Sequence, residues 1–334
     1  LSKYLTRLFK STWKPTVLGL VASVTMASAV HASYLEHPSV KPFISEMVEK
    51  HGFNQKEMEA LFKQAEKKQS ILDAIARPAE KRLEWKGYRK IFITDDRISR
   101  GKKFMEKHAE TLARAEKEFG VPKSIIAAII GVETRYGKNK GGYRVVDALS
   151  TLAFDYPPRS KFFKSELEQM LLLSREQQFD PIDLKGSYAG AMGYGQFIPS
   201  SYRNFAVDFD NDGVADILNN PVDAIGSVAN YFKKHKWVEG QPVAGLASIK
   251  GDQYEEALYK SLKLKFTLKE MAQWGITSDD GFNLDAKGKL LKLEGRKGTE
   301  YWLGLHNFYV ITRYNHSHLY AMAVFELSKA LRAE

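Results

Sequence analysis

The chain has 334 residues, of which 44% are hydrophobic and 27% are charged, a composition typical of a soluble globular protein rather than a disordered one. It contains no cysteine, which excludes a disulfide framework, a thiol nucleophile and a cysteine zinc site, and leads us to expect no lipidated anchor. The net charge of +10 favours an anionic partner, but Lys and Arg are scattered among acids, so nucleic acid is not expected.

The first 32 residues have the pattern of an export signal. They begin with a basic segment that carries Lys3, Arg7, Lys10 and Lys14. An uncharged stretch over residues 15–30 follows, and it is short for a membrane-spanning helix and diluted by Ser, Thr and Gly. We therefore predict a signal peptide over residues 1–32, cleaved after Ala32, and a periplasmic protein that is not a lipoprotein. Removal of the four basic residues leaves a net charge of +6.

Residues 34–119 have a helical pattern. Asn54 followed by Glu57 resembles a capping box at the start of one helix. A longer helix is predicted from about residue 95 to residue 119, because apolar residues recur at helical spacing and Gly120 supplies a stop.

The segment after Pro122 is the most informative one for function. Residues 124–132 are apolar all round, which predicts a helix buried at a domain centre, and Glu133 follows directly. Burial of a carboxylate is costly, and desolvation raises the pKa of a carboxyl group until it can donate a proton near neutral pH. Protonation of a glycosidic oxygen requires such an acid. A structural Glu133 paired with Arg135 is the alternative, and this helix alone does not decide between them.

The segment Gly186–Ser201 is dense in glycine, amide, hydroxyl and aromatic groups. Glycine lets the backbone approach a ligand closely, and the other groups can bind and stack on sugar rings. It does not match a nucleotide fingerprint, because the third glycine and a preceding strand are absent. A purely structural turn would leave the amide and aromatic content unexplained.

The remaining pattern predicts helices over Phe162–Gln177, Pro221–Lys234 and Leu319–Leu331, and strands of a small antiparallel sheet within Phe282–Leu293 and Tyr301–Thr312. The fold class is therefore α+β and predominantly helical.

An acidic loop over Asp208–Val214 has oxygen ligands at alternate positions and glycine at the sixth, as in an EF-hand. Position twelve is Asn219, where a bidentate acid is expected. A metal-free acidic turn is the alternative, since Asp and Asn populate turns. We predict a calcium ion that stiffens the fold, and no organic cofactor.

Three motifs in order, Glu133–Gly137, Gly186–Ser201 and Pro221–Phe232, resemble the B-type lytic murein transglycosylases from about residue 35 to the end. The resemblance implies a lysozyme-like catalytic core with a helical domain and a small antiparallel β domain. We assign the helical domain to residues 33–100, joined by a C-terminal helix of about 318–334. The core takes residues 101–240, and the β domain with a cleft-lining segment takes residues 241–317.

The resemblance also implies site residues. Glu133 matches the catalytic acid, and the matching substrate-binding residues are Ser187, Gln196, Tyr88, Tyr314 and Asn315. The family's longer metal loop closes on an acid that Asp223 matches. The implied calcium ligands are Asp208, Asp210, Asp212, Asp223 and the carbonyl of Val214.

The implied activity is that of a lytic transglycosylase, which cleaves the MurNAc-β-1,4-GlcNAc bond of peptidoglycan and forms 1,6-anhydromuramic acid ends. Glu133 would act first as acid and then as base, assisted by the substrate's acetamido group. A hydrolytic muramidase remains an alternative, but it needs a second carboxylate, and we give Asp147 and Asp155 structural roles. A catalytically inactive peptidoglycan-binding protein is the other alternative. The expected partners are glycan strands, with other cell-wall enzymes as candidates, and a monomer is expected.

Overall fold

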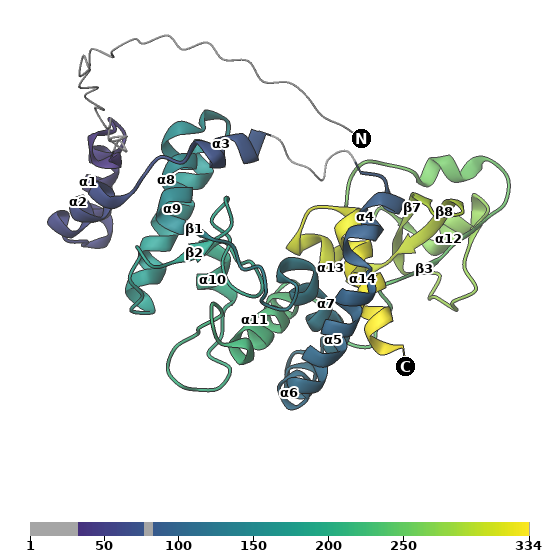
Figure 1. The fold of residues 1–334 in the computed structure, drawn as a ribbon. Coiled ribbons are helices and arrows are strands. Elements are labelled where there is room, and N and C mark those ends of the chain that lie inside the picture. Colours follow the sequence, from purple (N-terminus) through teal and green to yellow (C-terminus); the bar gives the residue numbers. More distant parts are fainter. Residues whose placement is uncertain (1–32, 77–82, 334) are drawn as a thin grey trace, which may run out of the picture. The chain divides into compact units, whose positions relative to one another are not determined.

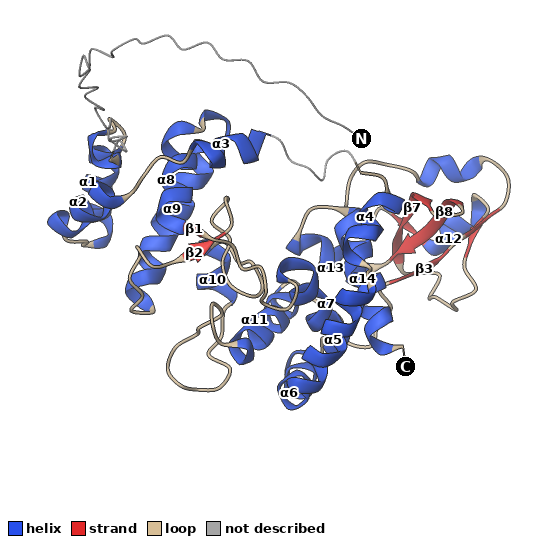
Figure 2. Cartoon of the chain, viewed as in Figure 1, coloured by secondary structure: helices blue, strands red, loops and turns tan. Residues whose placement is uncertain are grey.

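The computed structural model describes residues 33–76 and 83–333, so the predicted signal peptide lies outside the described residues. Contacts group the described residues into one unit. Helices account for most of the described chain and strands are few, which confirms the α+β, predominantly helical class (Figures 1 and 2). Within residues 33–76 and 83–333, no helix combines the length and apolarity that crossing a bilayer requires.

The first helices are η1 (Tyr34–Glu36), α1 (Val40–His51), α2 (Gln55–Gln64) and α3 (Gln69–Ala76). Of these, η1, α1 and α2 contact one another, whereas α3 contacts α8 (Val145–Asp155) of the core. Asn54 caps α2, because its side chain accepts hydrogen bonds from the backbone N–H groups of Lys56 and Glu57. The predicted helix start is thereby confirmed.

The next three helices are α4 (Trp85–Phe92), α5 (Asp95–Lys107) and α6 (Ala109–Phe119). The prediction of one helix from residue 95 to residue 119 is wrong, because the chain leaves helical geometry at His108 (φ −113°, ψ 29°). Both halves contact α7, but α5 also contacts α14, whereas α6 also contacts α11. Gly120 ends α6 in the left-handed conformation, as expected.

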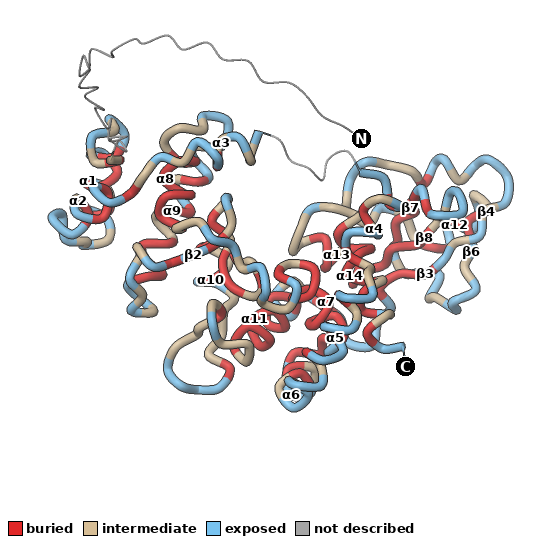
Figure 3. The backbone as a smooth tube through the Cα atoms, viewed as in Figure 1, coloured by how far each residue is buried: buried red, intermediate tan, exposed pale blue. Residues whose placement is uncertain are grey.

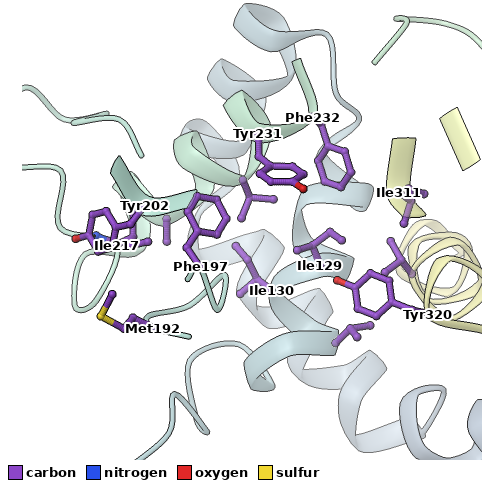
Figure 4. Packing of buried hydrophobic residues seen from close by; sticks show 14 of the residues in the cluster. Ile129, Ile130, Met192, Phe197, Tyr202, Ile217, Tyr231, Phe232, Ile311 and Tyr320 are labelled. Carbon is purple, nitrogen blue, oxygen red and sulfur yellow. The ribbon is translucent and has the colours of Figure 1, made fainter. Parts of the chain in front are cut away.

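Helix α7 (Lys123–Thr134) is the central helix of the core. Every residue from Ser124 to Val132 is buried, which confirms the prediction from its apolar sequence (Figure 3). It packs against α5, α6, α11 and α14. Figure 4 shows Ile129 of this helix between Tyr231 and Phe232 of α11 and Tyr320 of α14. Pro122 is the residue immediately before the helix, one position earlier than a first-turn proline.

The second part of the core contains α8 (Val145–Asp155), η3 (Pro157–Arg159), α9 (Ser160–Glu176), α10 (Pro199–Phe205) and α11 (Pro221–Lys234). The predicted helices over residues 162–177 and 221–234 are confirmed. A two-residue ladder joins β1 (Tyr143–Arg144) to β2 (Lys185–Gly186) at the start of the glycine-rich segment.

The small antiparallel sheet has the order β3-β8-β7-β5, formed by Ala244–Leu246, Gly298–Gly304, Lys287–Gly295 and Phe266–Thr267. A second pair joins β4 (Ser248–Ile249) to β6 (Ile276–Thr277). The short helices η4 (Gln253–Ala257) and α12 (Leu268–Gln273) lie in the same region. Buried side chains of these strands and short helices form a separate small core around Met271 and Leu290.

The strand prediction over residues 301–312 is wrong in its second half. Strand β8 ends at Gly304, and α13 (His306–Tyr314) follows after one residue. Phe308 and Ile311 are buried in the main core, a helical spacing that places both on one face. The strand predicted within residues 282–293 corresponds to β7, which begins only at Lys287. Helix α14 (His318–Arg332) confirms the predicted C-terminal helix. The domain boundaries inferred from the sequence stay predictions, because contacts group residues 32–334 together.

Candidate active site

Glu133 lies in the last turn of α7 and is half-buried rather than fully enclosed. Its Oε1 accepts a hydrogen bond of 2.6 Å from the hydroxyl of Tyr320, a residue of α14. The two helices pack directly against each other. The hydrogen bond from Tyr320, which the packing of α14 on α7 keeps in place, therefore holds the carboxyl group in one orientation.

A pair of stacked tyrosines lies beside this carboxyl group. The rings of Tyr314 and Tyr320 are nearly parallel, with centroids 6.4 Å apart and an interplanar angle of 9°. Burial, followed by the negative charge of Glu133, raises the pKa of both phenols well above the usual value. Both hydroxyls therefore remain protonated donors throughout the neutral range.

The glycine-rich segment is fastened to the end of α7. The hydroxyl of Thr134, the residue after Glu133, donates to the carbonyl of Tyr194 at 2.9 Å. The hydroxyl of Tyr314 donates to the carbonyl of Gly195 at 2.6 Å. A Cβ at Gly195 would lie 2.8 Å from that hydroxyl oxygen, which explains why this position has no side chain. These hydrogen bonds hold the glycine-rich segment in a fixed position relative to the end of α7 that carries Glu133.

Ser187 and Gln196 use some of their polar atoms to shape the same segment. The Oγ of Ser187 accepts hydrogen bonds from the backbone of Ala189 and Ala191. Gln196 has a left-handed backbone (φ 51°), and its Nε2 donates to the carbonyls of Lys140 and Gly193. Both side chains are half-buried, so each keeps an accessible face.

The two other expected site residues come from separate elements. Tyr88 of α4 is 1% exposed, and its phenol raises the pKa of the Tyr320 phenol, so the two side chains lie within electrostatic range. Asn315 follows α13 directly and is half-buried. Among the described residues, its side chain forms no hydrogen bond, so its amide is available to a ligand.

Sequence analysis missed Tyr320. It lies in an apolar stretch that forms a helix, where a tyrosine is more often a packing residue than a functional one. The signal that could have found it is a hydroxyl on the buried face of that helix, since a buried phenol requires a partner. The sequence does not show that this partner is Glu133.

Asp147 and Asp155, the carboxylates that a hydrolytic mechanism could recruit, are bound elsewhere. Asp147 is 1% exposed, pairs with Arg144 at 2.8 Å and accepts from the backbone N–H of Glu66 at 2.9 Å. Asp155 accepts from the hydroxyl of Tyr34 at 2.6 Å and pairs with Lys67. Both residues attach α8 to the first segments of the described chain.

The acidic loop brings three of the expected metal ligands together. Carboxylate oxygens of Asp208, Asp210 and Asp212 lie within 4.8 Å of one another, so this group could hold a metal ion. Left-handed backbone at Asn211 (φ 62°) and Gly213 (φ 97°) folds the loop back on itself. Three carboxylates at this spacing repel one another unless a cation lies between them.

Asp223 does not belong to that group of three. It is fully buried, and its two oxygens accept from the backbone N–H groups of Phe209 and Asp216 at 2.7 and 2.8 Å. Burial is the largest effect on the pKa of Asp223, which is raised. Asp223 therefore stabilises the backbone of the loop through these hydrogen bonds, and its role as a ligand stays a prediction. The Val214 carbonyl accepts from the N–H of Asp216 at 3.0 Å.

Comparisons with known proteins give a consistent result. The chain matches the family model described as "Transglycosylase SLT domain" over residues 36–329. It is 44% identical over 307 residues to the membrane-bound lytic murein transglycosylase B of Escherichia coli (strain K12), covering 89% of this chain and 84% of that protein.

Solved structures are similar over the same region. Catenated lytic transglycosylase SltB1 of Pseudomonas aeruginosa superposes with a TM-score of 0.87 at 55% identity, covering 89% of this chain and 98% of that one. The Escherichia coli lytic transglycosylase Slt35 in complex with calcium superposes with a TM-score of 0.82 at 44% identity, and the match covers 89% of this chain and 93% of that one. SltB3 of Pseudomonas aeruginosa in complex with NAG-anhNAM-pentapeptide superposes with a TM-score of 0.79 at 28% identity, and the match covers 90% of this chain and 80% of that one.

Proposed function

The chain belongs to the transglycosylase SLT domain family, and from this membership we propose that Glu133 is the only catalytic acid and base of the enzyme. The protein is a lytic transglycosylase: it cleaves the bond between N-acetylmuramic acid and N-acetylglucosamine in peptidoglycan and leaves 1,6-anhydromuramic acid ends. One observation carries the single-carboxylate mechanism. Glu133 is oriented by Tyr320, while Asp147 and Asp155 are bound to other partners.

In the first step, the carboxylic acid of Glu133 gives its proton to the glycosidic oxygen. The bond between that oxygen and C1 of the muramic acid residue breaks, and its electron pair stays with the leaving oxygen. The acetamido oxygen of the same sugar bonds to C1, which moves the developing positive charge onto the acetamido group, where oxygen and nitrogen share it. No second protein carboxylate is needed for this step, in contrast to the two-carboxylate scheme.

In the second step, Glu133 is a carboxylate and removes the proton from the C6 hydroxyl. The C6 oxygen then bonds to C1 and displaces the acetamido oxygen, which closes the 1,6-anhydro ring. The proton that Glu133 gave away is thereby recovered. Tyr320 donates to Oε1, so it supports the charged carboxylate between the two steps.

We propose that the sugar contacts come from Tyr88, Tyr314, Asn315, Ser187 and Gln196. Tyr314 is partly exposed and offers aromatic surface, and the amide of Asn315 offers a donor and an acceptor. Tyr88 is 1% exposed, so it would contact a sugar only after a movement that uncovers its ring. Ser187 and Gln196 lie in the segment that Thr134 and Tyr314 fasten beside the carboxyl group. Substrate binding by these five residues is a proposal, and the hydrogen bond from Tyr314 to Gly195 supports it by connecting the ring beside Tyr320 to the glycine-rich segment.

The test is mass spectrometry of the soluble products released from purified peptidoglycan. The expected products are one water lighter than reducing muropeptides and resist borohydride. Reducing ends would instead support a hydrolytic muramidase, and binding without products would support an inactive binding protein. Glu133→Gln is expected to abolish release while the variant still binds peptidoglycan, and normal turnover by this variant would refute the assignment.

We also propose that the acidic loop holds a structural calcium ion through Asp208, Asp210 and Asp212, with the Val214 carbonyl added. Calcium prefers such oxygen ligands, and the spacing of the three carboxylates fits one ion between them. The structure of Slt35 in complex with calcium supports this proposal. Asp223 would complete the ligand set only if one oxygen turned from its backbone partners.

Export to the periplasm is proposed on the basic and then uncharged pattern of residues 1–32 and on a substrate that belongs to the cell wall. Fractionation of cells, followed by N-terminal sequencing, tests it. A periplasmic protein that begins at Ser33 is expected. A protein that keeps residues 1–32 would refute cleavage after Ala32.

A further inference from the structure

A basic cavity lies between β7, the segment around Tyr259 and the first turn of α14. Its volume is about 320 Å³, and its basic lining residues are Lys260, Lys289, Lys292 and His318. None of the described residues that line it is acidic, and leucine side chains make up most of the rest. Such a lining favours an anionic group attached to an apolar body.

Lys289 is the most unusual residue of this cavity. It is 2% exposed, and its Nζ donates to the carbonyl of Tyr259 at 2.5 Å and lies 3.7 Å from the centroid of that ring. Among the described residues, no carboxylate pairs with it. Burial lowers its pKa to about 8, so the ammonium form still predominates at neutral pH. A buried ammonium group with one carbonyl partner is costly, and an anion would offset that cost.

His318 adds a nitrogen without a hydrogen-bond partner to the same cavity. Its Nε2 is buried and has no hydrogen-bond partner. Burial and then the charge of Lys289 lower the pKa of His318 to about 4, so the ring is neutral near pH 7. A neutral imidazole can place an N–H at this nitrogen and donate to an anion. Two donors therefore lack the acceptor that would satisfy them both.

The cavity is close to the catalytic group along the chain. His318 is the first residue of α14, and Tyr320, two residues later, binds Glu133. Tyr314 and Asn315 immediately precede this helix. The N-terminus of a helix also favours negative charge. A branch on a sugar bound near Glu133 could therefore reach this cavity.

We propose that the cavity formed by Lys289 and His318 binds a carboxylate of the peptide that branches from the glycan strand. The proposal rests on the proposed function, since it names a second part of the same substrate. Lys289 supplies the charge, His318 supplies a neutral donor, and the leucines contact the apolar part of the peptide. A peptide attached to muramic acid is part of the ligand in the SltB3 structure.

The decisive experiment compares two substrates with the full chain. Soluble glycan strands that carry peptides are compared with the same strands after an amidase has removed them. Lys289→Met is expected to raise KM for the peptide-bearing strands about three- to tenfold, with kcat unchanged and with no effect on the stripped strands. His318→Gln is expected to change KM in the same direction. Lys269→Met, an exposed lysine of α12, is the matched control and should change neither substrate.

Equal losses on both substrates would show a merely structural role for Lys289, and no loss on either would show that the cavity binds no peptide. Both results overturn the proposal. Stripped strands are also cleaved by a working enzyme, so a wild-type protein inactive on both substrates would count against the proposed function instead.

A calorimetric arm is independent of turnover. The free peptide is titrated into wild type and Lys289→Met, and binding to wild type alone is expected. Inorganic phosphate is titrated in parallel, and binding of phosphate without binding of the peptide would overturn the peptide as the source of the carboxylate.

Discussion

The hydroxyl of Tyr320 donates a 2.6 Å hydrogen bond to Oε1 of Glu133 and so connects the first residues of α14 to the last turn of α7. Neither helix could hold the carboxyl group alone, because Glu133 lies at a helix end, where side chains are least constrained. Since Tyr314 stacks on Tyr320 and bonds to Gly195, the same contact also positions the glycine-rich segment. Orientation of the catalytic group thus depends on three elements that are distant in sequence.

Removal of the Tyr320 hydroxyl should impair the reaction without unfolding the protein. A hydrogen bond to a charged group contributes about 1.5–3 kcal/mol, so Tyr320→Phe is expected to lower kcat roughly 10- to 100-fold. Loss of this donor also favours the protonated carboxyl, which is the form that acts in the first step, so the alkaline limb of the pH–rate profile should move to higher pH.

Tyr202→Phe is the matched control, because that buried phenol donates to the carbonyl of Ala215. It should reduce stability and leave the pH profile unchanged. An unchanged kcat and pH profile in Tyr320→Phe would contradict the positioning role.

A methyl group at Gly195 should disturb the site through Tyr314. Its Cβ would lie 2.8 Å from the Tyr314 hydroxyl, too close for the hydrogen bond to remain as it is. Gly195→Ala is expected to reduce turnover at least tenfold and to destabilise the fold by about 1–3 kcal/mol. Gly142→Ala adds the same methyl where nothing lies within 4 Å and serves as the control in activity and melting assays. Equal behaviour of both variants would contradict the argument.

Calcium should stabilise the protein by binding the folded state. At a concentration 100 times the Kd, the expected gain in free energy of unfolding is about 2.7 kcal/mol. Asp210→Asn should reduce the calcium-dependent rise in Tm, while the exposed Asp73→Asn should keep it. The measurement is thermal unfolding with added calcium and with chelator. A Tm that responds to neither would refute the metal site.

The pH dependence of stability should reflect His318. Its folded pKa of about 4 lies below the ordinary 6.5, so the unfolded chain binds more protons between these values. The free energy of unfolding therefore falls as pH drops from 6.5 to 4, by up to about 3 kcal/mol from this residue.

Burial lowers the pKa of His108, His235 and His316 as well, so they add to the same slope. His318→Phe should flatten the slope measured by denaturant unfolding between pH 4 and 7. A slope identical to that of wild type would show that His318 is not the residue responsible.

Local signals in the sequence were sufficient for several elements. The apolar run before Glu133 predicted a buried helix, because a helix surrounded by protein needs no polar face. Asn54 predicted a helix start, since its side chain satisfies backbone N–H groups within the next three residues. The alternating aspartates predicted a loop that gathers three carboxylates, because ligand spacing within one loop is a local property.

Other features depended on contacts between distant segments. The helix predicted over residues 95–119 breaks at His108, so that its two halves both contact α7 while the first also contacts α14 and the second also contacts α11. The alternation after Gly304 belongs to a helix whose apolar face meets the main core.

The sequence by itself determined the helical class and the family and predicted Glu133 as the catalytic carboxylate, because each rests on residues close together in the chain. Only the tertiary structure decided how that carboxylate is oriented. Tyr320 donates its hydrogen bond to Glu133 because α14 packs on α7. Lys289 and His318 line one cavity because β7 lies near the start of α14. Hydrogen bonds and charges act over a few ångströms, so spacing along the chain cannot indicate such partners before the chain has folded.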